Sequence, residues 1–452
     1  MIITLRDYQV RAIAESRALV MSGKRAPLLV SSTGTGKTAM GAAIARGHVD
    51  QGGTVLWLSH RAELIDQSAR ALTAAGCDVG IIAASRVDGE RRHARVQVAS
   101  VQTMLARGMN GVAPSMVVYD EARHYLAAEW SAVLGAYPDA LRIGLDATPE
   151  RQDGIGLGGL FDCIVVATTI ARATAAGYLV PLEIIAPDRA LESGELAATP
   201  LDAYLTHAAG QQAVVFAPHV RAAREYAAEF SAAGIPAGVI TGDMIAASRV
   251  AVLAGYGAGA LRVLCSVGTL VEGWDSPATG VAILARGCGS PGAYIQIVGR
   301  VLRPYPGKTS ALLLDLRGVV HIHGRPDEDR VYSLEGRGIR RASEMGTERF
   351  CPVCKALMAD NDTVCADCGR ERPESEMPHV VSAPLKKYAR DALKADSPER
   401  IVARLAKWLR EAEDAGHKRG AALYRFKGAY MRWPTSTETK SAERMNAKGS
   451  GT

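Results

Sequence analysis

The sequence predicts an α/β protein with two tandem domains, each built around a parallel β-sheet. Short apolar runs alternate with segments of helical spacing in two separate blocks, which is the pattern of repeated β/α units. Only the first block carries a Gly-rich turn between a strand and a helix. At 452 residues the chain is too long for one ordinary core. We therefore expect a first domain over residues 1–170 and a second over residues 171–340.

The first block begins with a helix, predicted over residues 7–22 by apolar residues at helical spacing and a following Gly. Apolar segments of strand length then follow one another along the chain. In parallel sheets, ligand chemistry gathers at the carboxyl ends of the strands. The predicted strands are 26–30, 54–58, 96–99, 116–119 and 141–145, with helices at 39–45 and 61–75.

Residues 31–38, with the sequence SSTGTGKT, have the composition and context of a phosphate-binding loop. Backbone N–H groups and the helix N-terminus can surround a phosphate, the lysine can reach the β- and γ-phosphates, and the last hydroxyl can hold Mg²⁺. Ser31 stands where the strict pattern has Gly, and a chance turn is the alternative that the flanking strand and helix disfavour. The residues predicted to bind nucleotide are Gly34, Thr35, Gly36, Lys37 and Thr38.

The second block contains no second phosphate loop. Its predicted strands are 213–216, 237–240, 262–265, 281–284 and 311–314, and its predicted helices are 219–233, 245–256 and 291–302.

Two adjacent acids, Asp120 and Glu121, follow the predicted strand 116–119. An aspartate there can hold Mg²⁺ through water, and a neighbouring glutamate can polarise the water that attacks a γ-phosphate. Such a pair is common after strands, but this one lies in the block that carries the phosphate loop. We therefore predict catalytic roles for both.

Three polar residues recur at helical spacing in the second block, namely Gln296, Arg300 and Arg303. Arginines offered from a separate domain can stabilise the transition-state charge of phosphoryl transfer. The alternative is a surface helix with salt bridges. Gly299 within the segment disfavours that alternative, because Gly weakens a helix unless something must approach closely.

Taken in order, these segments resemble the motifs of superfamily 2 helicases over residues 5–304, which implies two RecA-like domains. Residues 5–9 resemble the Q motif, which implies that Gln9 recognises adenine. The resemblance implies that Gly273 and Asp275 of motif V also contact the nucleotide. Positions that it implies to face nucleic acid are His60, Arg61, Ser100, Gln102, Thr103, Thr241 and Thr269.

Within that superfamily the chain is similar to the RadD-type and type III restriction-like branch, through residues 147–154 and 177–181. It departs from the superfamily pattern twice. Arg123 stands where motif II usually has His, with His124 one place later, and Asp146 stands where motif III usually has Thr or Ser. Asp146 either weakens unwinding or engages a basic partner such as Arg123, and the sequence leaves both possibilities open.

Four cysteines form two C-x-x-C pairs within residues 345–376, namely Cys351, Cys354, Cys365 and Cys368. Four thiolates at this spacing suit a closed, tetrahedral, structural Zn²⁺ site, which disfavours a disulfide pair or a catalytic zinc. Bracing of the C-terminal region and contact with nucleic acid are both open roles. We expect the remaining cysteines to be small buried hydrophobes; they are Cys77, Cys163, Cys265 and Cys288.

The C-terminal region, residues 380–452, is predicted to be basic and helical with a disordered tail. The formal net charge of the chain is +6, and residues 383–452 contain sixteen Lys or Arg and eight Asp or Glu. This excess predicts either a polyanion partner or a solvated helix. Aromatic residues between basic ones could stack on bases or pack a helix onto the rest of the chain; they are Tyr424, Phe426, Tyr430 and Trp433.

The sequence therefore predicts an ATP-dependent helicase or translocase that uses ATP, Mg²⁺ and Zn²⁺ and binds nucleic acid, with DNA preferred on the family resemblance. The alternatives are a duplex translocase that does not unwind, an RNA helicase, or a zinc-dependent binding module with a degenerate ATPase. With neither a signal-peptide pattern nor an apolar run of membrane-spanning length, we expect a cytoplasmic protein without a membrane partner.

Overall fold

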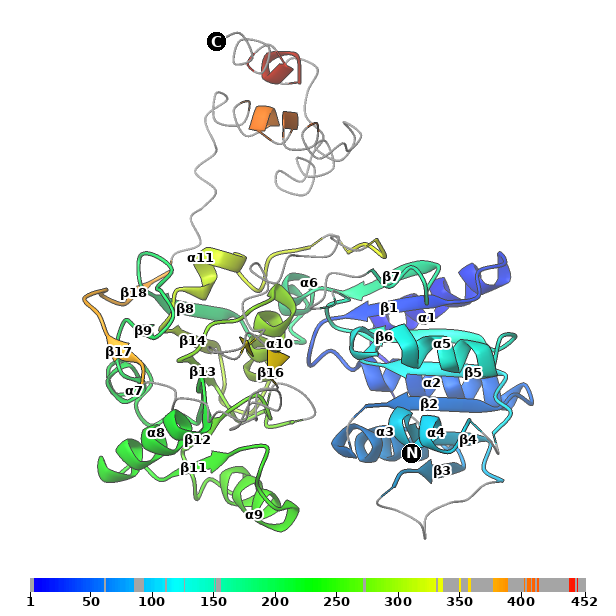
Figure 1. The fold of residues 1–452 in the computed structure, drawn as a ribbon, viewed down its shortest axis with the longest axis horizontal. Coiled ribbons are helices and arrows are strands. Elements are labelled where there is room, and N and C mark those ends of the chain that lie inside the picture. The colour runs from blue at the N-terminus through cyan, green and yellow to red at the C-terminus, as the bar shows by residue number, and fades with distance from the viewer. Residues whose placement is uncertain are drawn as a thin grey trace. The chain divides into compact units, whose positions relative to one another are not determined.

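The computed structural model divides the chain into two compact units, Met1–Lys387 and Tyr388–Thr452, which are described separately. Figure 1 shows their elements along the chain. The residues that the structure describes are 4–60, 62–84, 93–109, 112–125, 127–149, 151, 156–270, 274–330, 332–335, 349–350, 357–358, 377–388, 402, 405–407, 409–410, 413, 439–443 and 445.

The first sheet of the larger unit has seven parallel strands in the order β3-β4-β2-β5-β6-β1-β7. Its strands are β1 (Pro27–Ser31), β2 (Val55–Ser59), β3 (Val79–Ile82), β4 (Val96–Ser100), β5 (Met116–Asp120), β6 (Leu141–Asp146) and β7 (Cys163–Thr168). The helices of this part are α1 (Asp7–Met21), α2 (Lys37–Asp50), α3 (Ala62–Ala74), α4 (Val101–Ala106), the 3₁₀ turn η1 (Ala122–His124) and α5 (Ala127–Ala136).

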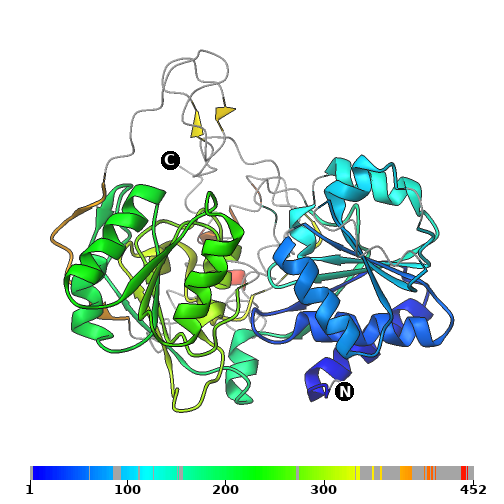
Figure 2. The same cartoon turned by 90° about the horizontal axis from the view of Figure 1, so that it is seen from below.

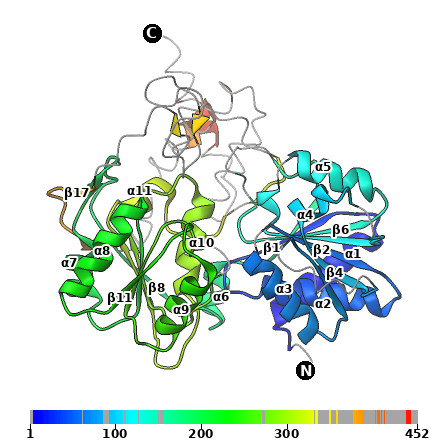
Figure 3. The same ribbon diagram turned by 60° about the horizontal axis from the view of Figure 1, so that its bottom comes forward.

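The apolar residues of these strands alternate between two core clusters, one on each face of the sheet. Trp57 and Val118 pack with α1, α2 and α3, whereas Leu56 and Val117 pack with α4 and α5. Figure 3 shows these helices on opposite sides of the strands. Both faces are covered, which explains why the strands read as continuous apolar runs.

The second sheet has the order β11-β12-β10-β13-β14-β8-β18, and every strand is parallel except β18, which pairs antiparallel with β8. Its strands are β8 (Leu182–Ala186), β10 (Ala213–Phe216), β11 (Ala237–Ile240), β12 (Val263–Ser266), β13 (Val281–Leu284), β14 (Ala311–Asp315) and β18 (Lys386–Lys387). The helices are α6 (Ile170–Ala175), α7 (Pro200–His207), α8 (Val220–Ala232), α9 (Ala246–Gly257), α10 (Pro291–Val301) and α11 (Val319–His323).

Two short two-stranded sheets complete this unit, and helices cover both sides of each large sheet (Figure 2). One pairs β9 (Glu195–Leu196) with β17 (His379–Val380), and the other pairs β15 (Arg349–Phe350) with β16 (Leu357–Met358).

The two predicted parallel-sheet domains are therefore confirmed, and each predicted strand lies within one or two residues of an observed one. In the two large sheets, strands β3, β7, β8 and β18 were not predicted, and neither were the strands of the two short sheets. The cysteines Cys77, Cys265 and Cys288 are buried as expected, whereas Cys163 is partly exposed at the start of β7. The four cysteines of the predicted zinc module lie outside the described residues.

In the C-terminal unit, Leu405, Ala406 and Ala442 form a small buried cluster against which Val402 and Leu409 pack. Leu405 and Leu409 lie in the region, residues 380–452, that the sequence predicts to be helical. The aromatic residues 424–433 lie outside the described residues. Within the described part of the chain, no helix has both the length and the apolar character needed to cross a bilayer.

The packing of α2 on the first sheet generates a stability prediction. A Cβ atom at Gly41 would lie 2.5 Å from Cδ1 of Leu145 and 2.6 Å from Cη2 of Trp57. We expect Gly41→Ala to lower the free energy of unfolding by about 1–3 kcal/mol through overpacking, despite the better helix propensity of Ala. Urea denaturation measures the change. The matched control is Gly135→Ala in α5, where a Cβ meets nothing within 4 Å; equal stability of the two variants would contradict the packing.

Candidate nucleotide-binding and hydrolysis site

The predicted phosphate loop lies between β1 and the N-terminus of α2, as the sequence requires. Gly36 precedes the helix with φ +80°, a left-handed conformation that favours glycine. The loop is tied internally, because the Thr35 hydroxyl donates to the Ser32 carbonyl at 2.5 Å and lies 2.6 Å from Oγ of Ser31. Ser31 therefore supports the loop through its hydroxyl, which a glycine could not do.

Gln9 holds this loop from outside. Its Nε2 donates to the Thr35 carbonyl at 3.0 Å and to the Gly36 carbonyl at 3.4 Å, and its Oε1 accepts from the backbone N of Arg6 at 2.8 Å. The Tyr8 hydroxyl donates to the same Thr35 carbonyl at 2.6 Å. The contacts of Gln9 thus fix the loop, and its recognition of adenine stays a prediction.

Asp120 ends β5, and Glu121 follows it in a left-handed conformation with φ +51°. Such a conformation in a non-glycine residue persists where surrounding contacts hold it. Oε1 of Glu121 lies 3.5 Å from Nζ of Lys37, and Oδ2 of Asp120 accepts from the Ser68 hydroxyl at 3.3 Å. Burial, followed by the charge of Glu121, raises the pKa of Asp120 to about 7.

The two departures from the superfamily pattern contact each other. Nη1 of Arg123 lies 2.6 Å from Oδ1 of Asp146 and 2.5 Å from Oε2 of Glu121. Oδ2 of Asp146 also accepts from the backbone N of Arg123 at 2.8 Å. The sequence leaves open whether Asp146 weakens unwinding or engages a basic partner such as Arg123, and the structure contains the contact with Arg123.

Residues of the second sheet complete the site from α10 and the segment after it. Nε2 of Gln296 donates to Oε2 of Glu121 at 3.3 Å, and Nη1 of Arg300 donates to the Trp274 carbonyl at 2.7 Å. Arg303 lies two residues beyond the end of α10 and pairs with Asp275. Burial lowers the pKa of Arg303 to about 10.

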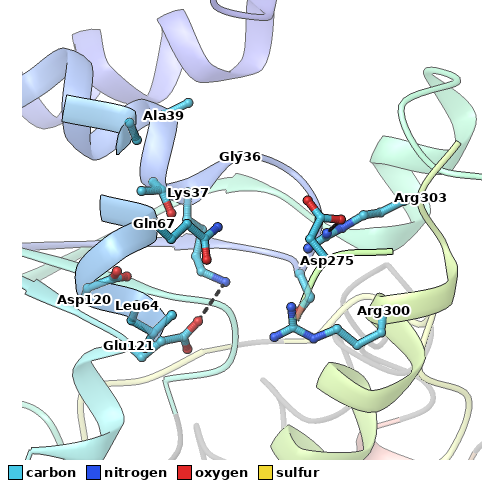
Figure 4. A pocket seen from close by; sticks show the side chains of 14 residues that line it. Gly36, Lys37, Ala39, Leu64, Gln67, Asp120, Glu121, Asp275, Arg300 and Arg303 are labelled. Carbon is cyan, nitrogen blue, oxygen red and sulfur yellow. Dashed lines mark ion pairs between the residues drawn. The ribbon is translucent and has the colours of Figure 1, made fainter. Parts of the chain in front are cut away.

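One cavity of about 360 Å³ brings the predicted residues together. Figure 4 shows Lys37, Asp120 and Glu121 on one side and Arg300 and Arg303 on the other, projecting toward the same space. The predicted residues that line it are Gly34, Gly36, Lys37, Thr38, Asp120, Glu121, Asp275, Arg300 and Arg303. The remaining lining residues were not predicted from the sequence; they are Thr33 of the loop, Ala39 of α2, and Leu64, Gln67 and Ala71 of α3.

Gly299 allows α10 to approach the phosphate loop. A Cβ at this position would lie 2.5 Å from Cβ of Thr33. The sequence predicts a close approach at this glycine, and the structure identifies Thr33 as what approaches.

The residues of the first domain that the resemblance implies to face nucleic acid differ in exposure. His60 is partly buried after β2, and its ring stacks on that of His124 with centroids 4.5 Å apart. The Ser100 hydroxyl accepts from the backbone N of Thr103, which is buried, whereas Gln102 is exposed.

In the second sheet, Thr241 is buried after β11, and the Thr269 hydroxyl donates to the Ile240 carbonyl at 3.3 Å and lies 3.0 Å from Oγ of Ser266. Their contact with nucleic acid stays a prediction. Arg61 and Gly273 lie outside the described residues.

A phosphate loop and paired carboxylates from one parallel sheet, with arginines from a second, are the parts of a two-domain nucleotide hydrolase. The family model "Type III restriction enzyme, res subunit" matches residues 2–151, and "Helicase conserved C-terminal domain" matches residues 197–305. The chain belongs to the superfamily 2 helicases, in the branch that resembles restriction enzyme subunits.

Individual relatives agree with this assignment. A 51.5 kDa protein of a Lactococcus phage (isolate 7-9) is 26% identical over 366 residues, which cover 76% of this chain and 78% of the phage protein. A Saccharomyces cerevisiae protein named "Putative ATP-dependent helicase IRC3" is 25% identical over 359 residues, 70% of this chain and 51% of that protein.

Among solved structures, the ATP-dependent Type ISP restriction-modification enzyme LlaBIII bound to DNA has a TM-score of 0.54 at 18% identity. The match covers 69% of this chain and 28% of that enzyme, so the chain spans less than a third of it. At this identity the likeness concerns the fold.

Helicase domains of this superfamily use ATP with Mg²⁺, and Thr38 and Asp120 fit a magnesium site. Both line the cavity, and a cation would relieve the cost of burying Asp120 beside Glu121. Among the described residues no group of three or more His, Cys, Asp or Glu could hold a metal. Mg²⁺ commonly takes one or two carboxylates with substrate phosphates and waters, so two protein ligands suffice. The cysteines predicted to bind Zn²⁺ are not among the residues described.

The raised pKa of Asp120 predicts a pH-dependent gain in stability for Asp120→Asn. The folded-state pKa of about 7 exceeds the ordinary value of 3.8, so ionised Asp120 destabilises the fold above pH 7 and this cost disappears toward pH 4. Each pKa unit corresponds to about 1.4 kcal/mol. In EDTA without nucleotide, we expect a Tm several degrees above the parent at pH 8 and little difference at pH 4. A gain of equal size at both pH values would contradict this origin.

The contact between Gly299 and Thr33 predicts that Gly299→Ala separates α10 from the loop. A displacement of about 1 Å at a reacting centre can cost about 100-fold in rate, and we expect kcat for ATP hydrolysis to fall at least tenfold. The matched control is Gly257→Ala at the end of α9, where a Cβ meets nothing within 4 Å. Parental ATPase activity in the Gly299 variant would show that the close approach is dispensable.

Proposed function

We propose that the chain is an ATP-driven motor that moves along DNA and hydrolyses ATP between its two parallel-sheet domains. The observation that carries the proposal is the cavity in which carboxylates of the first domain face arginines of the second. A site divided in this way links the hydrolysis of one nucleotide to the separation of two domains.

In this mechanism the phosphate loop binds the β-phosphate through its backbone N–H groups, and Lys37 binds the β- and γ-phosphates. Glu121 accepts a hydrogen bond from the attacking water and orients it toward the γ-phosphate. Mg²⁺, held by Thr38 and Asp120, supplies charge neutralisation of the phosphates when bound.

Arg300 and Arg303 stabilise the negative charge that develops on the phosphate oxygens. Both now contact groups of their own domain, the Trp274 carbonyl and Asp275. We propose that the triphosphate displaces these partners, because a phosphate offers charged acceptors that a carbonyl oxygen does not. Gln296 of α10 donates to Glu121 from the second domain.

DNA is the proposed track. Support comes from the similarity of the chain to restriction enzyme subunits. The similar structure of LlaBIII is described as bound to DNA. The exposed Gln102 and the partly exposed His60 are the proposed contacts of the first domain, and the basic C-terminal region is a further one. Motor contacts go mainly to the nucleic-acid backbone, so RNA is an outcome of the test.

A translocase that follows duplex DNA without separating its strands is the second candidate. The observation that favours it is the replacement of the usual motif II and motif III residues by Arg123 and Asp146.

The test is the ATPase rate of the full chain without nucleic acid and with single-stranded DNA, duplex DNA, forked DNA or RNA, with strand displacement measured in the same samples. We expect the largest stimulation with DNA. Stimulation without displacement selects the translocase, and equal rates in all samples, including the blank, contradict a motor.

Glu121→Gln tests the assignment of the water-orienting group. Loss of a general base typically costs about 10²–10⁴ in rate, so we expect kcat to fall by that order while nucleotide binding persists. Lys37→Ala is the companion variant, expected to weaken nucleotide binding as well. Full function in the Lys37 variant would instead favour a nucleic-acid-binding module with a degenerate ATPase.

A further inference from the structure

The guanidinium of Arg123 lies between two buried carboxylates. One nitrogen, Nη1, is 2.5 Å from Oε2 of Glu121 and 2.6 Å from Oδ1 of Asp146. The exposed fractions of the three side chains are 7% for Arg123, 9% for Glu121 and 0% for Asp146. Because Asp146 also binds the backbone N of Arg123, it fixes both ends of the arginine. In such a buried network, rotation of one member would leave a charge without its partner.

Helix α10 contacts this network at two points. Oδ1 of Asp146 accepts from the backbone N of Thr148 at 2.9 Å. A Cβ at Gly292, near the start of α10, would lie 2.9 Å from Oγ1 of Thr148, so the helix rests on that hydroxyl. About one turn further along the helix, Gln296 donates to Glu121. Contacts therefore run from α10 through Asp146 and Arg123 to Glu121, and from Glu121 back to α10.

We propose that Arg123 and Asp146 act as one positioning unit that holds Glu121 in its hydrolytic position when α10 is docked on the first domain. This inference rests on the proposed function and adds to it the residues that make hydrolysis depend on domain closure. The two departures from the superfamily pattern are then one combined replacement, in which the charged pair Arg123 and Asp146 stands where the superfamily usually has His and Thr or Ser.

Charge balance explains why the replacement involves both residues. Asp146 without Arg123 would place a third buried carboxylate beside Asp120 and Glu121. Arg123 without Asp146 would lose the acceptor that fixes its backbone N and its side chain. Its guanidinium would then move together with the Glu121 carboxylate and would not hold that carboxylate in place. We therefore expect either residue alone to lower the rate of ATP hydrolysis, and the two together to support it.

The test measures kcat and KM for ATP, with saturating single-stranded DNA, in the full-length parent and its variants. For Arg123→Gln and for Asp146→Asn we expect kcat to fall at least tenfold and KM to stay within about threefold, because Lys37 and the loop are unchanged. The double variant R123H/D146T restores the residue types usual in the superfamily. We expect it to recover kcat to within about threefold of the parent, far above the product of the single effects.

The matched control is Arg325→Gln. Arg325 is a buried arginine of the second sheet domain, and its Nε lies 2.8 Å from Oδ1 of Asp327. We expect this variant to lower the Tm while kcat per folded molecule stays at the parental value. A fall in kcat that merely follows the Tm across all variants would mean that Arg123 and Asp146 are structural only, and would overturn the proposal.

Three other results also overturn it: parental kcat in Arg123→Gln, additive single effects, or a double variant that is inactive or unfolded. The double variant decides the outcome if the single variants do not fold. A parent chain without ATPase activity in any nucleic-acid sample defeats the proposed function itself. An active parent with an unaffected Arg123 variant defeats only this inference.

Discussion

A buried carboxylate is stable only when donors satisfy it on several sides, and Glu121 imposes that requirement on the whole larger unit. Lys37 approaches it from α2, Arg123 from η1 and Gln296 from α10. Two of these donors belong to the first sheet domain and one belongs to the second. The surroundings of Glu121 are therefore complete only in a closed arrangement, so its chemistry and the closure of the domains depend on each other.

The phosphate loop is held in the same way from two sides. Gln9 and Tyr8 bind its Thr35 carbonyl, and α10 approaches Thr33 through Gly299. A loop that must surround a phosphate with its backbone N–H groups gains from this support, since little reorganisation is left for the moment of binding. Within the loop, the Ser32 carbonyl accepts from both the backbone N and the hydroxyl of Thr35.

Sequence patterns predicted the elements that carry strong local signals. The strands of both sheets are continuous apolar runs because both faces are covered, and Gly34, Gly36 and Lys37 carry a pattern tied to one backbone geometry. The contact between Arg123 and Asp146 could be suspected from two coincident departures, 23 residues apart, but not predicted. Leu64, Gln67 and Ala71 line the cavity because α3 packs where it does, and no local pattern encodes such tertiary placement. Strands β3 and β7 lie at the two edges of the first sheet and are partly exposed, and Glu183 interrupts the apolar run of β8, so none of the three is a fully buried strand.

The antiparallel pairing of β18 with β8 has a consequence for how the chain avoids self-association. An unpaired edge strand presents a row of free N–H and C=O groups to which another chain can add. Here Lys386 pairs with Ala186 and Lys387 with Ile185, and Nζ of Lys387 lies 2.7 Å from Oε2 of Glu183. The outermost strand of the second sheet is thus only two residues long and carries two lysines, a poor template for aggregation. Shortened versions of the chain would keep this protection only if they extend through Lys387.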